Sequence, residues 1–200
     1  MNVVQPIRDL DMLQRCYEIA REHDMRARKG EVSWELILLV GFNTSMRNSD
    51  FTALKVDELR GREYAEKRAQ KTGKQAKILI NPPARRELKR LLAGRRGEEL
   101  AFLSRQRGSK TGRRKQVTRQ RVYQIINEIA REAGIQDKVG CHTLRKTFGF
   151  HYYKATGDVV SLQRILGHTS RRDTLVYIGI IQEQIDESLM NFSLVPKRTR

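Results

Sequence analysis

The sequence predicts one mainly α-helical domain over residues 1–200 with a small antiparallel β-sheet, an α+β fold. Its 200 residues are enough to bury a core without disulfides or metals. Apolar residues recur at three- and four-residue spacing through most of the chain, which is typical of amphipathic helices. Only residues 56–80 look like strands, and no repeat or low-complexity linker marks a domain boundary.

The first third of the chain is expected to be helical. Helices are predicted over residues 10–24, 34–45 and 50–55, each following a residue that can cap it: Asp9, Ser33 and Ser49. The inward face of the first helix is predicted to hold Leu10, Leu13, Tyr17 and Ala20. The second helix is apolar nearly all round, so it should be central and buried. Arg47 falls in the junction before the third helix.

Residues 56–80 are the candidate for the sheet. Residues 78–80 form a strand, the segment before residue 70 fits either a strand or a helix, and residues 70–74 form a turn with Gly73 at its tip. Lys71 would lie at the start of this turn and reach outward, and a solvated turn lysine is the simpler interpretation.

The second half alternates helices with polar loops. Further helices are predicted over residues 83–94, 119–133, 142–155 and 158–166, followed by a helix that carries Tyr177 and is capped by Asp173, and by a last helix with Ile181, Ile185 and Leu189 on one face. Thr118 should cap the 119–133 helix and Gly134 should end it. Residues 105–116 contain no apolar residue and are predicted to be an exposed basic loop.

The charge points to a polyanionic partner. The formal net charge is +17, and residues 85–121 hold fourteen lysines and arginines but three glutamates, a net charge of +11. Nucleic acid is the usual partner of such a surface, although membrane-surface and ribosomal proteins share this charge. The residues expected to contact DNA, mainly through its backbone, are Arg85, Arg86, Arg113, Arg114, Lys115, Arg119 and Arg121.

The location is predicted to be the cytoplasm. No apolar run approaches the roughly 18 residues of a membrane span, and the first residues do not resemble a secretory signal. Cys16 and Cys141 are far apart and are interpreted as buried free thiols in a reducing compartment.

Residues 141–177 hold the candidate chemistry. His142 and Arg145 are three residues apart and would share one helix face, His168 follows in an LGH triplet, and Tyr177 lies nine residues later. Imidazoles and a guanidinium can donate to a phosphate, and the phenol is a possible nucleophile. A positioned set of cations can stabilise phosphoryl transfer, and the chain lacks HExxH, DxD and clustered Cys/His motifs. We therefore expect neither a metal nor a cofactor.

Two upstream residues would complete this chemistry. The alkoxide expelled by attack of Tyr177 is a poor leaving group, and Lys71 is a candidate proton donor. A second arginine would help to hold the phosphate, but Arg47, in a helix junction, is by itself more simply interpreted as bonding carbonyl groups at the helix end.

The order of these elements resembles the catalytic domain of the tyrosine recombinases, the phage integrase family. The resemblance runs from about Val4 to Tyr177 through GFNTSMRNSD, QKTGK, HTLR and LGH. It implies Tyr177 as nucleophile, Arg47 and Arg145 as phosphate clamps, Lys71 as acid, His142 as proton-handling partner, His168 as phosphate donor and Asp50 as the residue that orients them. The first motif differs from the family's usual TGLR followed by SE, since TSMRNSD stands there.

The resemblance also implies partners and an activity. It implies site-specific cleavage and rejoining of double-stranded DNA through a 3′-phosphotyrosyl intermediate, in a prokaryotic cytoplasm and at the nucleoid when acting. The family's usual N-terminal DNA-binding domain is not found, so the chain is a fragment or resembles short stand-alone recombinases. Residues 180–200 would be a subunit contact in a homotetramer on DNA, or would pack on their own domain.

Three rival functions remain open at this point. A type IB topoisomerase shares the chemistry but relaxes supercoils. A non-catalytic DNA-binding relative would keep the surface and lose the reaction. An RNA-binding or ribosomal protein explains the charge but not the ordered motifs.

Overall fold

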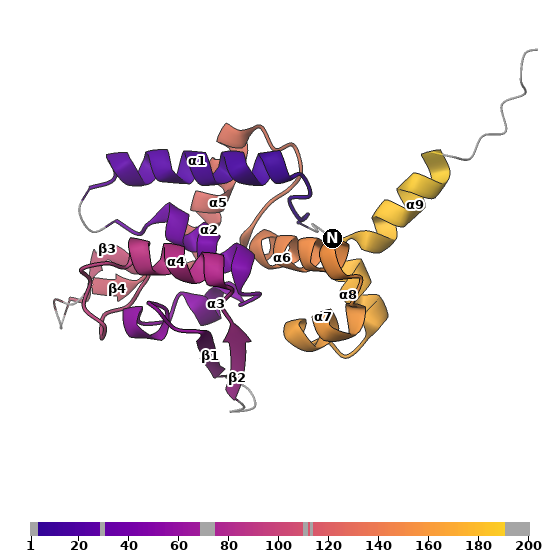
Figure 1. The fold of residues 1–200 in the computed structure, drawn as a ribbon. Helices are drawn as coiled ribbons and strands as arrows, with labels where there is room; N and C mark the ends of the chain where they lie inside the picture. The colour runs from indigo at the N-terminus through magenta and orange to yellow at the C-terminus, as the bar shows by residue number, and fades with distance from the viewer. Residues whose placement is uncertain (1–3, 29–30, 69–74, 110–111, 113, 191–200) are drawn as a thin grey trace, which may run out of the picture.

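A computed structural model of the chain describes residues 4–28, 31–68, 75–109, 112 and 114–190 (Figure 1). The elements of this part are α1 Leu10–Arg26, α2 Trp34–Asn43, α3 Asn48–Phe51, a 3₁₀ turn Val56–Glu58, β1 Tyr64–Arg68, β2 Gln75–Leu79, α4 Pro82–Leu91, β3 Leu103–Arg107, β4 Arg114–Gln116, α5 Arg119–Ala133, α6 Cys141–Thr156, α7 Val159–Leu166, α8 Arg171–Ile178 and α9 Ile180–Met190. The predicted class, mainly α with small antiparallel sheets, is confirmed.

The main body packs around α2, as its apolar sequence predicts. Every residue from Trp34 to Gly41 is buried, and α1, α4 and α6 contact this helix. Gly41 lets α6 approach closely, since a Cβ at this position would lie 2.5 Å from Leu144 Cδ1. The core is thus built on a central helix that also fixes the first turn of α6.

Two antiparallel hairpins lie at the edge of this body. β1 pairs with β2 from Tyr64↔Leu79 to Arg68↔Gln75, which confirms the predicted sheet. The second hairpin, β3–β4, occupies much of the segment predicted to be a loop, so that prediction was wrong there. Its strands carry mostly exposed polar side chains, so they lack the alternating apolar signal of a strand. The hairpin is anchored at its base by buried Phe102, whose carbonyl accepts from Val117 N–H at 2.9 Å.

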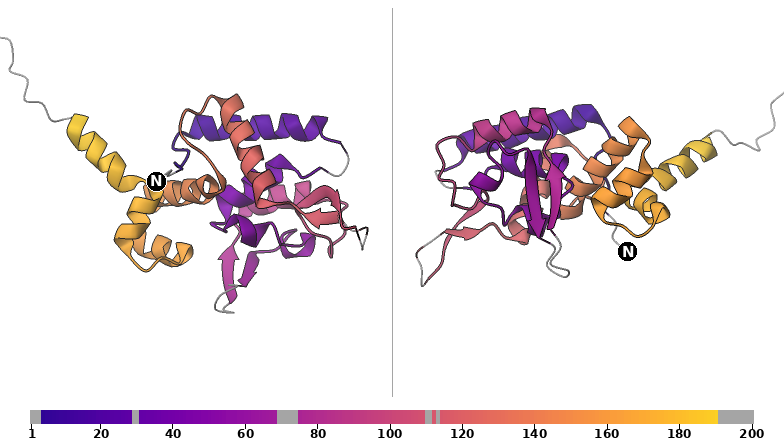
Figure 2. Two further views of the ribbon diagram at one scale, coloured as in Figure 1. Left: turned by 180° about the vertical axis from the view of Figure 1, so that it is seen from behind. Right: turned by 60° about the horizontal axis from the view of Figure 1, so that its bottom comes forward.

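The C-terminal helices form a second, smaller cluster beside the main body. Phe150 of α6 packs there with Leu162, Leu166, Ile178 and Ile180. α6 therefore belongs to both clusters, because Leu144 lies in the main core. Beyond α8 the chain turns at Gly179, and α9 projects away from the body in all three views (Figures 1 and 2).

The predicted N-terminal caps are confirmed for three helices, each of which has a single polar capping residue before it. Asp9, Ser33 and Thr118 accept hydrogen bonds from the first turns of α1, α2 and α5. Three expectations were wrong, and each concerns the start of a helix. α3 begins at Asn48 after Arg47, so Ser49 does not cap it; Ser170 rather than Asp173 caps α8; and Leu10 is 69% exposed.

These corrections have local causes. Ser170 Oγ accepts from Asp173 N–H, so the serine three residues earlier takes the capping position and Asp173 falls in the first turn. The buried stripe of α1 runs through Cys16, Ile19 and Ala20, and Leu10 does not lie on that face. Within the described residues, no helix is both long and apolar enough to cross a membrane.

Candidate active site

The site begins where α6 and α8 meet. His142 lies in the first turn of α6, and its Nδ1 atom is 3.4 Å from the hydroxyl of Tyr177, near the end of α8. Arg145, one turn further along α6, is close enough to the Tyr177 hydroxyl to lower the pKa of the phenol against the effect of burial. The spacing of three residues thus places both groups beside one phenol, as the sequence predicts.

Arg145 connects three parts of the chain. It is 4% exposed and donates to the carbonyl oxygens of Ser45 and Leu166. Ser45 has a φ of 55°, a left-handed conformation that is uncommon outside glycine. This arginine therefore ties the α2–α3 junction to the end of α7. Burial lowers the pKa of Arg145 from its usual value, while the nearby Tyr177 hydroxyl opposes that shift.

A cavity of about 160 Å³ opens beside these groups. Its walls are Arg47, Asn48, Ser49, Arg119, Cys141, His142 and Arg145. Three of its seven residues are arginines from three separate elements, and none is an acid, so the cavity suits a small anion. Arg47, exposed at the N-terminus of α3, and Arg119, in the first turn of α5, both line it.

His168 completes the surroundings of the phenol. It follows Gly167 at the end of α7, and its Nδ1 atom lies 3.2 Å from Thr174 Oγ1 on α8. Its ring meets the Tyr177 ring edge-to-face, with centroids 5.0 Å apart. Burial lowers the pKa of His168, and the charges of Arg145 and Arg47 lower it further.

The electrostatics favour neutral histidines around a neutral phenol. Burial first, and then the charges of Arg119, Arg145, Lys146 and Arg47, lower the pKa of His142. Burial raises the pKa of Tyr177, and Arg145 and Arg47 oppose that rise. A neutral imidazole beside a phenol can accept its proton, so the pair fits an activated nucleophile.

The structure brings together five of the six residues expected to act on the phosphate: Arg47, His142, Arg145, His168 and Tyr177. Lys71 lies outside the described residues. Asp50, in α3, is close enough to Arg145 for its charge to raise the pKa of that arginine.

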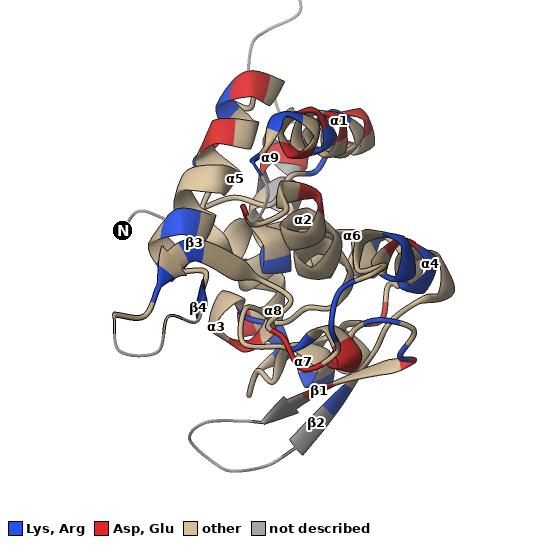
Figure 3. Cartoon of the chain, turned by 90° about the vertical axis from the view of Figure 1, so that its left-hand side faces the viewer, with Lys and Arg blue, Asp and Glu red and all other residues tan. Residues whose placement is uncertain are grey.

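The residues expected to contact DNA are distributed over several elements. Arg119 lines the cavity, Arg85 and Arg86 lie on α4, and Arg114 and Lys115 lie on β4. Figure 3 shows basic segments on α4 and beside the β3–β4 hairpin. Arg121 lies over the Trp34 ring, 5.8 Å from its centroid. Arg113 is outside the described residues.

Sequence reasoning missed three residues here. Asn48 and Cys141 line the cavity, and Cys141 is partly exposed rather than buried as expected. Lys146 is 6% exposed, and its Nζ lies 5.1 Å from the Tyr177 ring centroid. A signal for Lys146 was available, because residues 142, 145 and 146 fall on one helical face.

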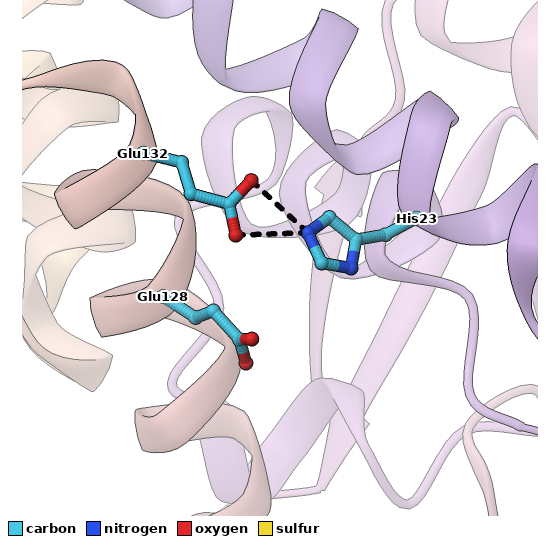
Figure 4. A group of neighbouring side chains, drawn as sticks. All are labelled: His23, Glu128 and Glu132. Carbon is cyan, nitrogen blue, oxygen red and sulfur yellow. Dashed lines mark hydrogen bonds and ion pairs between the residues drawn. The ribbon is translucent and has the colours of Figure 1, made fainter.

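His23, whose partner the sequence does not reveal, joins α1 to α5. Its Nε2 atom is 3.0 and 3.2 Å from the two Glu132 oxygens, and Glu128 stands one turn earlier on α5 (Figure 4). The His23 ring also stacks on Trp34, with centroids 3.8 Å apart. A histidine and two carboxylates resemble a metal donor set, with ligand atoms within 4.8 Å of one another. The His23–Glu132 hydrogen bond and the stacking on Trp34 already account for this arrangement as a contact between two helices.

Comparison with known proteins agrees with this geometry. Probable integrase/recombinase YoeC of Bacillus subtilis is 33% identical over 183 residues, which are 92% of this chain and 93% of that protein. Tyrosine recombinase XerA of Pyrococcus furiosus is 28% identical over 168 residues, which are 84% of this chain but 57% of XerA. The chain thus spans little more than half of the longer relative.

Solved structures share the fold. The XerH site-specific recombinase bound to a palindromic difH substrate superposes with a TM-score of 0.65 at 18% identity, over 94% of this chain and 53% of that one. The sequence model of the phage integrase family matches residues 9–183. Three arginines and His142 line one cavity, and Tyr177 contacts His142 beside it. In agreement with this site, the chain belongs to the phage integrase family.

Proposed function

We propose that the protein is a site-specific DNA recombinase that cuts and rejoins strands through Tyr177. The observation that carries this proposal is the Tyr177 hydroxyl, which contacts His142 and Arg145 at the edge of an arginine-lined cavity. Relatives named as integrases and tyrosine recombinases, and neighbours solved on DNA, support it.

The cavity would hold the scissile phosphodiester. Arg47 and Arg145 would donate to its non-bridging oxygens, where negative charge grows in the transition state. Arg119 lines the same cavity and would add a third cation. His168, beside the ring of Tyr177, would donate to the same phosphate.

Proton transfer balances the reaction. The oxygen of Tyr177 forms a bond to phosphorus, and the bond to the 5′ oxygen breaks. His142 accepts the phenolic proton, and Lys71 gives a proton to the leaving oxygen. The products are a 3′-phosphotyrosyl ester and a free 5′ hydroxyl. Attack by the 5′ hydroxyl of another strand reverses the step, so the ester conserves the energy of the broken bond.

We also propose that residues 1–200 act as one catalytic domain and that α9 contacts a neighbouring subunit in a tetramer on DNA. Support comes from the projection of α9 away from the body (Figure 1) and from Leu189 and Met190, which are 62% and 88% exposed.

The test uses nicked duplexes tiled across the DNA that flanks the gene. In such a substrate the cleaved fragment diffuses away, so a covalent complex accumulates and survives denaturation. The wild type should form this complex and Tyr177→Phe should not. Tyr153→Phe is the matched control, because Tyr153 packs in the same small cluster. A complex that persists in Tyr177→Phe would refute the assignment of the nucleophile.

A second assay separates recombination from relaxation. The wild type should exchange strands between two copies of the reactive duplex and leave plasmids without that sequence supercoiled. Efficient relaxation of such plasmids would instead indicate a topoisomerase.

A further inference from the structure

Lys146 is a largely buried lysine, and among the described residues no acidic side chain pairs with its ammonium. The residue is 6% exposed, and its side chain has no hydrogen bond or ion pair in that part of the chain. Burying a charge in this way is costly unless something compensates it. Burial lowers the pKa of Lys146, and the positive charge of Arg8 lowers it further. Such a residue needs a reason other than stability.

The contact that Lys146 does make is with the proposed nucleophile. Its Nζ lies 5.1 Å from the centroid of the Tyr177 ring, within the range of a cation–π interaction. The other sides of that ring are met edge-to-face by His168, at 5.0 Å between centroids, and by His142, at 6.5 Å. The phenol is therefore enclosed by one cation and two imidazoles.

The chain before α1 contacts α6 next to Lys146 and lies close to the end of α8. The Ile7 N–H donates to Thr147 Oγ1 at 2.9 Å, next to Lys146 on α6. A Cβ at Gly179, two residues beyond Tyr177, would lie 2.9 Å from a guanidinium nitrogen of Arg8. The N-terminal segment thus joins the helix that carries Lys146 to the end of α8, and the charge of Arg8 reaches Lys146.

We propose that Lys146 is a positioning residue for the nucleophile. Its ammonium holds the Tyr177 ring by a cation–π contact, so that the hydroxyl stays beside His142 and Arg145. The contact strengthens as the phenol gives up its proton, because a phenolate ring is richer in electrons. This proposal rests on the proposed function, in which Tyr177 attacks the phosphate.

The burial of Lys146 makes a positioning role distinguishable from a direct contact with DNA. A side chain that is 6% exposed offers little surface to a duplex, so its removal should slow cleavage and leave affinity unchanged. A lysine that contacts the phosphate backbone would behave in the opposite way.

The experiment compares Lys146→Met, Lys146→Arg and Lys154→Met on the nicked duplex that gives the highest yield of covalent complex. Lys154 is the matched control, because it lies on the same helix with its Nζ 5.6 Å from the centroid of the Phe150 ring. The rate constant for covalent complex formation should fall roughly tenfold in Lys146→Met, because cation–π contacts between the exposed and the desolvated limits are worth about 1.4 kcal/mol. Lys146→Arg should restore most of the rate, and Lys154→Met should match the wild type.

Two outcomes would overturn the proposal. One is a Lys146→Met rate within twofold of the wild type. The other is a loss of DNA affinity in Lys146→Met that accounts for the whole effect, which would make Lys146 a DNA contact.

The contact between Lys146 and Tyr177 can also be tested by NMR on the wild type without DNA. This measurement depends neither on activity nor on whether the variants fold. A nuclear Overhauser effect should join the ε-methylene protons of Lys146 to the ring protons of Tyr177, assigned with Tyr177→Phe. Its absence would refute the contact. If this signal is present but the wild type forms no covalent complex on any duplex, the proposed function fails and the contact stands.

Discussion

His142 Nδ1 and the Tyr177 hydroxyl lie 3.4 Å apart, although 35 residues separate them in the chain. The pair connects the first turn of α6 with the last turn of α8, across the small second cluster. A neutral imidazole at this distance is positioned to receive the phenolic proton. The rate of the reaction should therefore depend on pH through the protonation state of His142.

The first prediction concerns this protonation state. The pKa of His142 and that of His168 are both lowered in the folded protein, mainly by burial. More than half of each imidazole should therefore be neutral at pH 6.5, the usual pKa of histidine. The rate of covalent complex formation should decline with falling pH, and the midpoint of the decline should lie below about pH 6.5. A decline centred above pH 7 would show that His142 is protonated more easily than this environment allows.

The same shifts predict how stability depends on pH. The unfolded chain takes up protons as pH falls through about 6.5, whereas the folded chain resists until its lowered pKa values are reached. Stability contributed by the neutral histidines is therefore present above about pH 6.5 and is lost as pH falls below it. Urea midpoints measured between pH 7.5 and 5.5 should decline less steeply in the double variant His142→Gln/His168→Gln than in the wild type. Equal slopes in the two proteins would contradict this.

Local sequence patterns predicted part of this site, and the reason is visible in His142 and Arg145. Their spacing lies within one helical turn, so periodicity alone places them together. Arg145 and Ser45, in contrast, are 100 residues apart, and their contact depends on how α6 packs against α2. Only the resemblance to a family, and not periodicity, indicated that Arg47 belongs to the same site.

The missed features have the same physical origin. The β3–β4 hairpin has few buried side chains of its own, so its strands leave no apolar pattern. Lys146 looked like one more basic residue in a chain of net charge +17, because burial depends on tertiary packing. Asp173 and Ser170 are both good caps, and the sequence alone does not rank them.

A third prediction contrasts the two proposed clamps. Arg145→Met should lower the free energy of unfolding by about 1–3 kcal/mol for each carbonyl, of Ser45 and Leu166, that loses its donor. Arg47 is exposed, so Arg47→Ala should change stability by less than about 0.5 kcal/mol. Both variants should lose covalent complex formation. Urea unfolding and the denaturing gel assay measure the two effects separately, and strong destabilisation by Arg47→Ala would be unexpected.

A fourth prediction concerns the basic hairpin. Arg114→Glu/Lys115→Glu should weaken binding to any duplex, because these side chains should face phosphates rather than bases. The slope of log K against log salt should become shallower by about one unit for each phosphate that the variant no longer neutralises. Arg15→Glu/Arg26→Glu on α1 makes the same change in net charge and should leave the slope nearly unchanged. Equal effects of the two double variants would assign the salt dependence to overall charge.

The last prediction tests how closely α6 and α8 must approach. A Cβ at Gly149 would lie 2.7 Å from Ile178 Cγ2, and Ile178 is the residue after Tyr177. Gly149→Ala should therefore push α8 outward, lower stability and slow formation of the covalent complex. An alanine in a helix otherwise gains about 1 kcal/mol over glycine, so destabilisation would come from the clash alone. Ile178→Ala removes the clashing atom, although it leaves a cavity that costs stability by itself. In the Ile178→Ala background, Gly149→Ala should become neutral or stabilising, and chemical denaturation of all four proteins gives the coupling energy. If Gly149→Ala is equally harmful in both backgrounds, the contact with Ile178 does not set the position of α8.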